Sequence, residues 1–380
     1  MQSPADEVAR RELVDKTVLL LCAVALNALE FFIPRLPFFP WLKPGLANIV
    51  TMIWIIRYGT IDALVFSLIR SWIAGCYFGF SFVSLSLAVS GGVFSTLVMG
   101  VLWSMFGRRG MMGCIGIGVA GALFHNLGQL LAVYALLTSN NRIFYQFPVM
   151  ALASVAFGGC VGALVLPAIR MFEGRGTGRD PAAFASPPAM PSPALSERVT
   201  AVALIAVSFS IVFVTSTAAL IIIAACAAIA VLSLCKGRVS LLVAPLHRFW
   251  ALFLFIALMY CILPYGTRLD RWSFLTHEGV TATLQQWLRL YAWLELSFIL
   301  ARFRFHVVLF AMLSRLFWRR EVTLTAGLLA FEYVPLVADA GRKRGKGFFG
   351  NLIRHPLLTA KQGISGLYDE IVERLGEGRG

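Results

Sequence analysis

The sequence predicts an all-α, polytopic helical membrane protein, and three observations support this fold class. Of the 380 residues, 59% are hydrophobic and only 14% are charged, whereas a soluble domain carries about 25% charged residues. Many apolar runs reach the roughly 17–25 residues that a helix needs to cross a bilayer. Runs such as 199–214 and 218–234 lack the alternation of apolar and polar residues that a membrane β-barrel requires.

A proline-rich linker divides the chain into two membrane halves. Residues 172–198 read FEGRGTGRDPAAFASPPAMPSPALSER, a composition that favours an extended chain and cannot bury a core. We therefore predict a first half, residues 1–171, and a second half, residues 199–380, as separate domains on either side of this linker.

Six apolar segments follow one another in the first half, and the basic residues around them predict their orientation. With six spans, both ends of this half lie on the same side of the membrane. The ends and loops of that side hold nine Arg or Lys residues: Arg10, Arg11, Lys16, Arg57, Arg108, Arg109, Arg170, Arg175 and Arg179. The opposite loops hold three: Arg35, Lys43 and Arg142. The positive-inside rule then places both ends in the cytoplasm. The predicted spans are 17–33, 46–57, 60–77, 82–106, 111–137 and 147–169.

The second half has a different pattern of apolar runs. Residues 200–234 are predicted to form two spans with a turn near Ser216, and residues 247–264 form another. The segment 281–305 is apolar but carries four charged side chains. It is therefore either a span with buried polar positions or a helix that lies in the membrane interface.

The end of the chain is more polar than the rest of the second half. A basic cluster at 342–346 follows an apolar stretch, and residues 356–375 have the pattern of an amphipathic helix. Such helices either bind a partner at the cytoplasmic face or lie on the lipid surface, and composition leaves both interpretations open.

Polar side chains inside spans are costly, so each is a candidate for function. We predict a polar pocket that opens outward and binds a solute. The alternative is that these side chains only join helices to one another, which we favour for any single Asn or Gln but not for the ionisable residues. The predicted substrate-binding residues are Glu30, Lys43, Asn48, Arg70, His125, Asn126 and Gln129.

Motifs for catalysis, metal binding and nucleotide hydrolysis are absent from the sequence. The chain has no GxxxxGK[ST] loop, no HExxH, no GxSxG and no DDxxD. Its seven cysteines form no CxxC pair, and its formal charge of +14 is spread over loops between apolar runs. We therefore predict no catalytic residue, no metal or cofactor and no nucleic-acid partner.

A resemblance to a known family is carried by several strings in the first half. The string ALNALEFFIPRLPFFPWLKPGLANIVT at 25–51, Arg70, SGG at 90–92 and GALFHNLGQL at 121–130 resemble the Gx family over about residues 17–170. That family is grouped with the S components, the substrate-binding subunits of energy-coupling factor (ECF) importers. It is also labelled heptaprenyl diphosphate synthase component I.

The second half resembles the T component of the same importers, mainly at its C-terminus. T components carry two cytoplasmic coupling helices, and each helix ends in a short motif with a central Arg, usually Ala-Arg-Gly. Here the motifs read Lys-Arg-Gly and Gly-Arg-Gly, so the Ala is replaced in both. The resemblance implies contact with cytoplasmic P-loop ATPase subunits through Arg344, Gly345, Arg379 and Gly380.

The resemblance implies a fused membrane subunit of an ECF-type ABC importer. It would lie in the cell (inner) membrane with both termini cytoplasmic, bind a small-molecule solute from outside and rely on separate ATPases. The second label of the family implies an alternative, a membrane accessory component of a polyprenyl (heptaprenyl) diphosphate synthase. An ATP-independent facilitator is a third possibility. The polar residues suit a small zwitterion, a vitamin-like molecule or a metal chelate.

Overall fold

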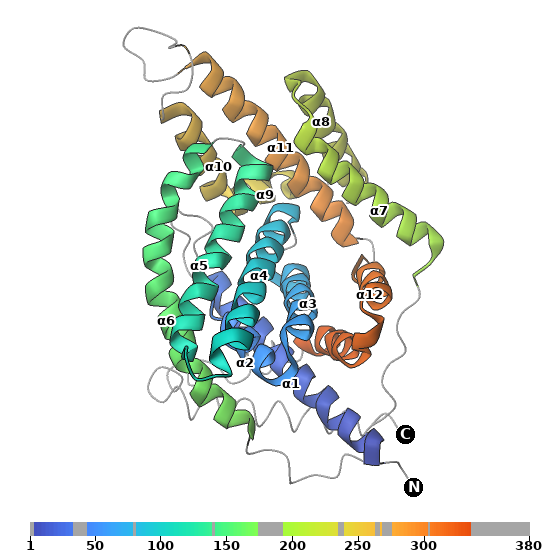
Figure 1. Ribbon diagram of the computed structural model, residues 1–380. Coiled ribbons are helices and arrows are strands. Elements are labelled where there is room, and N and C mark those ends of the chain that lie inside the picture. Colours follow the sequence, from blue (N-terminus) through green and yellow to red (C-terminus); the bar gives the residue numbers. More distant parts are fainter. Residues whose placement is uncertain are drawn as a thin grey trace, which may run out of the picture.

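The structure, a computed structural model, describes most residues of the chain. They lie almost entirely in helices (Figure 1), and none of them forms a β-strand, so the all-α prediction is confirmed. The described residues are 4–32, 44–78, 81–138, 141–173, 193–234, 239–262, 267, 276–302 and 305–335.

Each of the six apolar segments predicted in the first half contains one helix. Gly59, at φ +87°, separates the second helix from the third, because only glycine adopts this backbone angle without strain. The fourth and fifth helices continue into π-helical turns at Trp103–Gly107 and Tyr134–Thr138. The six helices are α1 (Pro4–Phe32), α2 (Asn48–Tyr58), α3 (Thr60–Phe78), α4 (Phe82–Leu102), α5 (Cys114–Val133) and α6 (Phe147–Glu173).

The second half has shorter helices and more breaks. The break near Ser216 is confirmed, since a short 3-10 turn after the seventh helix ends at Phe213 and the eighth helix starts at Thr217. The seventh helix begins inside the predicted linker, where the Glu197 carboxylate accepts a hydrogen bond from the Ala194 N–H at 3.0 Å and so caps the helix. The helices are α7 (Leu195–Ser210), α8 (Thr217–Leu234), α9 (Ser240–Arg248), α10 (Trp250–Ala257), α11 (His277–Arg302) and α12 (Phe305–Leu316), followed by a helix over residues 321–335.

Five helical segments of the described chain are long and apolar enough to cross a membrane. A sixth would be formed by the bent pair Ser240–His247 and Trp250–Tyr260, which meet at 61°. The protein is therefore a multi-pass membrane protein. The five segments are Phe82–Gly107, Cys114–Thr138, Asn141–Arg170, Leu195–Phe213 and Thr217–Leu234.

Three further helices carry charged residues and lie in the interior of the molecule. Side chains of α1 and α3, such as Leu19 and Phe66, are fully buried in the largest hydrophobic core. In α11, Trp293 and Glu295 are fully buried as well. Segment 281–305 therefore has buried polar positions, whereas the described helices that are long and apolar enough to cross a membrane do not include α11.

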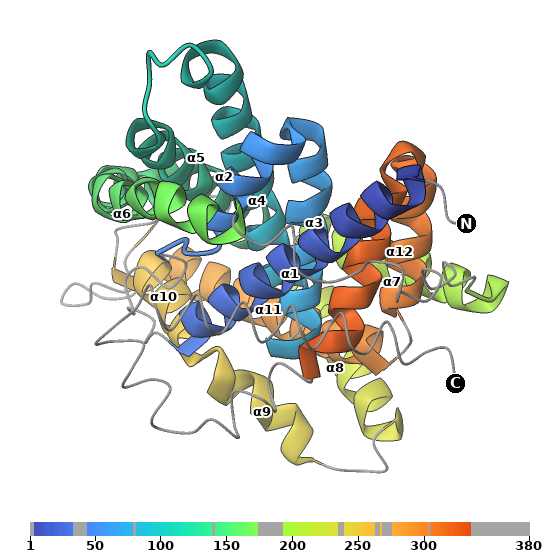
Figure 2. The same ribbon diagram turned by 90° about the horizontal axis from the view of Figure 1, so that it is seen from below.

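The two halves pack closely against each other. Phe310 in α12 and Leu324 in the helix over 321–335 belong to the same core as α1 and α3, and Figure 2 shows these orange helices beside α1 and α3. On the other side, α11 crosses near α4 (Figure 1), where the Phe82 N–H donates to Ser297 Oγ at 2.6 Å. The linker thus connects two halves that share hydrophobic cores.

Candidate functional site

Arg70 is the central residue of a polar cluster within the first half. Its guanidinium extends from α3, with Cζ 5.8 Å from the centre of the Phe66 ring, and the residue is only 4% exposed. No described residue accepts a hydrogen bond from its Nε or Nη1 atom. The charge of Glu30, which lies near the end of α1 and is 7% exposed, acts on this guanidinium. Two buried opposite charges therefore interact among the helices of the first half.

Two adjacent glycines let α4 approach both neighbouring helices within this cluster. A Cβ on Gly92 would lie 2.6 Å from Ser67 Oγ and 4.0 Å from Arg70 Nη2, so Gly92 faces α3. A Cβ on Gly91 would lie 2.9 Å from His125 Cε1 and 3.0 Å from Gln129 Cγ, so Gly91 faces α5. The SGG string of the sequence thus marks the place where α4 packs between Arg70 and the two polar residues of α5.

His125 and Gln129 form a pair on α5. They stand one turn apart, and the Gln129 amide Nε2 donates to His125 Nε2 at 3.1 Å. Gln129 is 4% exposed, and its Oε1 atom has no partner among the described residues. The structure therefore brings Arg70, His125 and Gln129 around the same part of α4.

Asn126 and Asn48 have other surroundings. The Asn126 amide donates to Ser154 Oγ at 2.8 Å and to the Met150 carbonyl at 3.2 Å, so it joins α5 to α6. Asn48 starts α2, is 4% exposed, and its Nδ2 lies 3.0 Å from the position of a Cβ on Gly45. Asn126 thus has the interhelical role that was the alternative for a single amide.

The remaining predicted site residues lie outside the described part of the chain. Lys43 falls between α1 and α2 in the sequence, and the coupling residues follow residue 335. Their assignments remain predictions from the sequence. The coupling residues concerned are Arg344, Gly345, Arg379 and Gly380.

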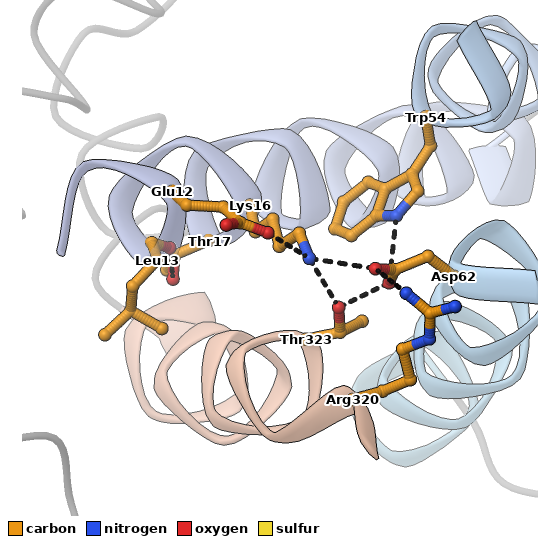
Figure 3. Close-up of polar contacts among 8 residues, drawn as sticks. All are labelled: Glu12, Leu13, Lys16, Thr17, Trp54, Asp62, Arg320 and Thr323. Carbon is orange, nitrogen blue, oxygen red and sulfur yellow. Dashed lines mark hydrogen bonds and ion pairs between the residues drawn. The ribbon is translucent and has the colours of Figure 1, made fainter. Parts of the chain in front are cut away.

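A second polar cluster joins the two halves, and we call it the inter-half cluster. Figure 3 shows Lys16 of α1 and Asp62 of α3 facing Thr323 from the helix over residues 321–335. Lys16 Nζ donates to Asp62 Oδ2 at 3.0 Å and to Thr323 Oγ1 at 2.9 Å. Thr323 Oγ1 in turn donates to Asp62 Oδ1. All three residues are at most 3% exposed.

More exposed side chains surround the inter-half cluster. Glu12 Oε1 lies 2.7 Å from Lys16 Nζ, and Arg320 Nη1 lies 3.5 Å from Asp62 Oδ2. Their side chains are 39% and 38% exposed, so each contributes less than a buried partner would. The Trp54 indole N–H also donates to Asp62 Oδ1, at 3.4 Å. Four helices from both halves therefore converge on one buried carboxylate.

The sequence pattern does not predict the inter-half cluster. Lys16 is one of the nine basic residues expected on the cytoplasmic side, whereas in the structure it is 2% exposed and paired with Asp62. An acidic residue near the start of an apolar segment was the one signal of a buried ion pair. Its partner Thr323 is more than 250 positions away in the chain, and nothing in the sequence alone connects the two.

The described residues show no arrangement for a bound metal. No three His, Cys, Asp or Glu side chains among them gather closely enough to hold an ion. The polar chemistry of the first half is therefore that of Arg70, Glu30, Gln129, His125 and the hydroxyls of α4. These groups can donate and accept hydrogen bonds and balance charge inside the membrane helices.

Comparison with known protein families gives one match, which lies in the first half. Residues 19–166 match the family described as "Heptaprenyl diphosphate synthase component I". The first half is similar to this family over these residues. The residues of this chain that match component I include Glu30, Arg70, His125 and Gln129. The match ends before the second half begins. No curated protein and no solved structure matches the chain.

Proposed function

We propose that the protein is the membrane subunit of an ECF-type ABC importer that binds a small solute and couples its uptake to separate ATPases. One observation carries the proposal: Arg70, inside a multi-pass membrane protein, has donor atoms without an acceptor among the described residues. A buried charge of this kind is expensive unless it has a function. Hydrophobic residues would pack α3 at lower cost, so a solute site is the better account.

The second half is proposed to transmit work to the first. The helix over residues 321–335 directly precedes the predicted coupling motifs in the chain, and Thr323 on that helix contacts Lys16 and Asp62. A displacement of the coupling motifs would therefore reach α1 and α3 through the inter-half cluster. Because the sequence has no P-loop, the nucleotide must be hydrolysed on other chains, bound from the cytoplasmic side of the cell (inner) membrane.

Reversing the charge of both coupling arginines should remove the ATPases from the purified protein. We expect that Arg344→Glu combined with Arg379→Glu reduces the co-purified P-loop ATPase at least about tenfold, because charge-assisted hydrogen bonds would become repulsions. Affinity purification from the native host, followed by quantitative mass spectrometry, measures this.

The matched control changes two arginines on the same predicted side of the membrane. Arg108 and Arg109 are exposed on the turn after α4, and Arg108→Glu with Arg109→Glu should keep the ATPases. Equal ATPase recovery from both double variants and from the wild type would contradict the coupling role. Solute uptake in vesicles that hold no ATPase would instead indicate the ATP-independent facilitator.

The family description supports a second candidate, a membrane accessory component of a heptaprenyl diphosphate synthase. The chain would then position or stabilise a catalytic partner, since it lacks a DDxxD motif for magnesium and diphosphate. Prenyl products made by host membranes with and without this chain distinguish the two. A change in product length or amount with unchanged solute uptake would favour the accessory role over import.

A further inference from the structure

We infer that the Arg70 cluster binds a small oxyanion, a carboxylate or phosphate group, on a solute that also presents an N–H or O–H donor. This inference rests on the proposed function, since it names the chemical class of the solute that the first half would bind. The evidence for it is a set of buried polar atoms on Arg70, on Gln129 and on two hydroxyl residues of α4. These atoms have no hydrogen-bond partner among the described residues.

The anionic part of the inference comes from Arg70. A guanidinium is always charged, and its planar fork of N–H groups matches the two oxygens of a carboxylate or phosphate. Arg70 is 4% exposed, and neither Nε nor Nη1 has an acceptor among the described residues. Leaving buried donors without acceptors costs free energy. An oxyanion would supply acceptors to the guanidinium edge that holds Nε or to the edge that holds Nη1, which a neutral apolar solute cannot do.

The donor on the solute is inferred from Gln129. An amide oxygen only accepts hydrogen bonds. Gln129 Oε1 has no donor among the described residues, and the amide nitrogen of the same side chain contacts His125. Ser95 Oγ and Thr96 Oγ1 are also fully buried and unpartnered in the described chain. Hydroxyls donate or accept, so they fit either end of such a solute.

Helix geometry places these groups around one face of α4. Gly92 faces Arg70 and Gly91 faces Gln129, and successive residues of a helix point about 100° apart. Ser95 stands one turn after Gly91 and therefore points between these two directions. Arg70, Ser95 and Gln129 are therefore arranged around the side of α4 that faces α3 and α5.

Glu30 adds a constraint on the charge of the solute. Its charge acts on Arg70, so a second anion bound there is repelled by the Glu30 carboxylate unless the solute also brings a compensating donor or cation. A hydroxy acid or an amino acid meets this condition better than a simple carboxylate. The arrangement therefore favours a solute in which acceptor and donor groups are close neighbours.

The experiment measures the thermal unfolding midpoint of the full chain in lipid nanodiscs. Sodium acetate, sodium phosphate and sodium chloride are compared at equal ionic strength, so that charge screening is the same, and the general effect of each anion is measured on Arg70→Gln. Acetate or phosphate should raise the midpoint above that in chloride. Arg70→Gln should weaken the apparent affinity at least about tenfold, whereas Arg108→Gln, an exposed residue outside the cluster, should leave it unchanged.

Two further comparisons keep the result unambiguous. Arg70→Lys keeps the charge but loses the planar fork, so it should retain the fold and show an intermediate shift. Glycolate and glycine should exceed acetate in the wild type, and Gln129→Leu should remove that advantage. A larger shift with phosphate than with acetate assigns a phosphorylated solute, and the reverse assigns a carboxylate.

Two results would overturn the inference. The first is the absence of an Arg70-dependent shift of the unfolding midpoint with both acetate and phosphate, which contradicts binding of an oxyanion. The second is an equal shift with acetate, glycolate and glycine, which contradicts the role of a donor on the solute. Either result leaves the proposed function standing if the ATPases still co-purify through Arg344 and Arg379. If the ATPases do not co-purify through Arg344 and Arg379 but the Arg70-dependent anion response is present, the coupling role is contradicted and the solute class is not.

Discussion

Replacing Asp62 by Ala should cost about 3–5 kcal/mol of unfolding free energy, because it removes the buried carboxylate of Lys16 and leaves only the half-exposed carboxylate of Glu12 beside it. Lys16 is 2% exposed and lies 3.0 Å from Asp62. Thr323 and Trp54 would also lose their shared acceptor. Unfolding by titration with SDS from detergent micelles measures the change. This loss of unfolding free energy should be among the largest for any single polar residue of the described chain.

Two control variants separate the buried ion pair from general damage. Glu12→Gln removes a partner of Lys16 whose side chain is 39% exposed, so it should cost no more than about 1 kcal/mol. The double change Lys16→Met with Asp62→Leu removes both charges, and apolar replacements of a buried pair are often neutral. If Asp62→Ala cost as little as Glu12→Gln, Lys16 would not be buried against Asp62.

Gly162→Ala in α6 should cost about 1–3 kcal/mol, because the new methyl group meets the backbone of α5. A Cβ there would lie 2.3 Å from the Cys114 carbonyl oxygen and 2.4 Å from Ile115 Cα. Backbone atoms cannot rotate away, so α5 and α6 must separate. This separation would also strain the hydrogen bond from Asn126 to Ser154 on the same pair of helices.

Gly159 provides the matched control for this prediction. It lies on the same helix one turn earlier, and a Cβ there meets nothing within 4 Å. Gly159→Ala should therefore be neutral or slightly stabilising, since alanine favours helix more than glycine does. The same SDS titration compares the two variants. Overlapping unfolding curves would show that α5 and α6 do not pack as closely as the structure indicates.

The polar groups of the candidate site were visible in the sequence to different degrees. Charged residues in apolar segments stand out, so the sequence pattern marks Glu30 and Arg70 as candidates, and the structure places both in the interior. Amides carry no such signal. Asn126 and Gln129 stand three positions apart on α5, yet one binds Ser154 and the other contacts His125. A small difference in helix rotation decides between these roles, and sequence spacing does not specify it.

The sequence by itself determined the helices and the membrane class, because apolar length is a local property that each segment carries alone. It placed one helix in each of the six predicted segments of the first half and the break before Thr217. Only the tertiary structure decided which charged helices lie inside. Burial of Lys16, Asp62 and Thr323 depends on helices from both halves meeting at one point, and such contacts between distant residues leave no periodic pattern in the chain.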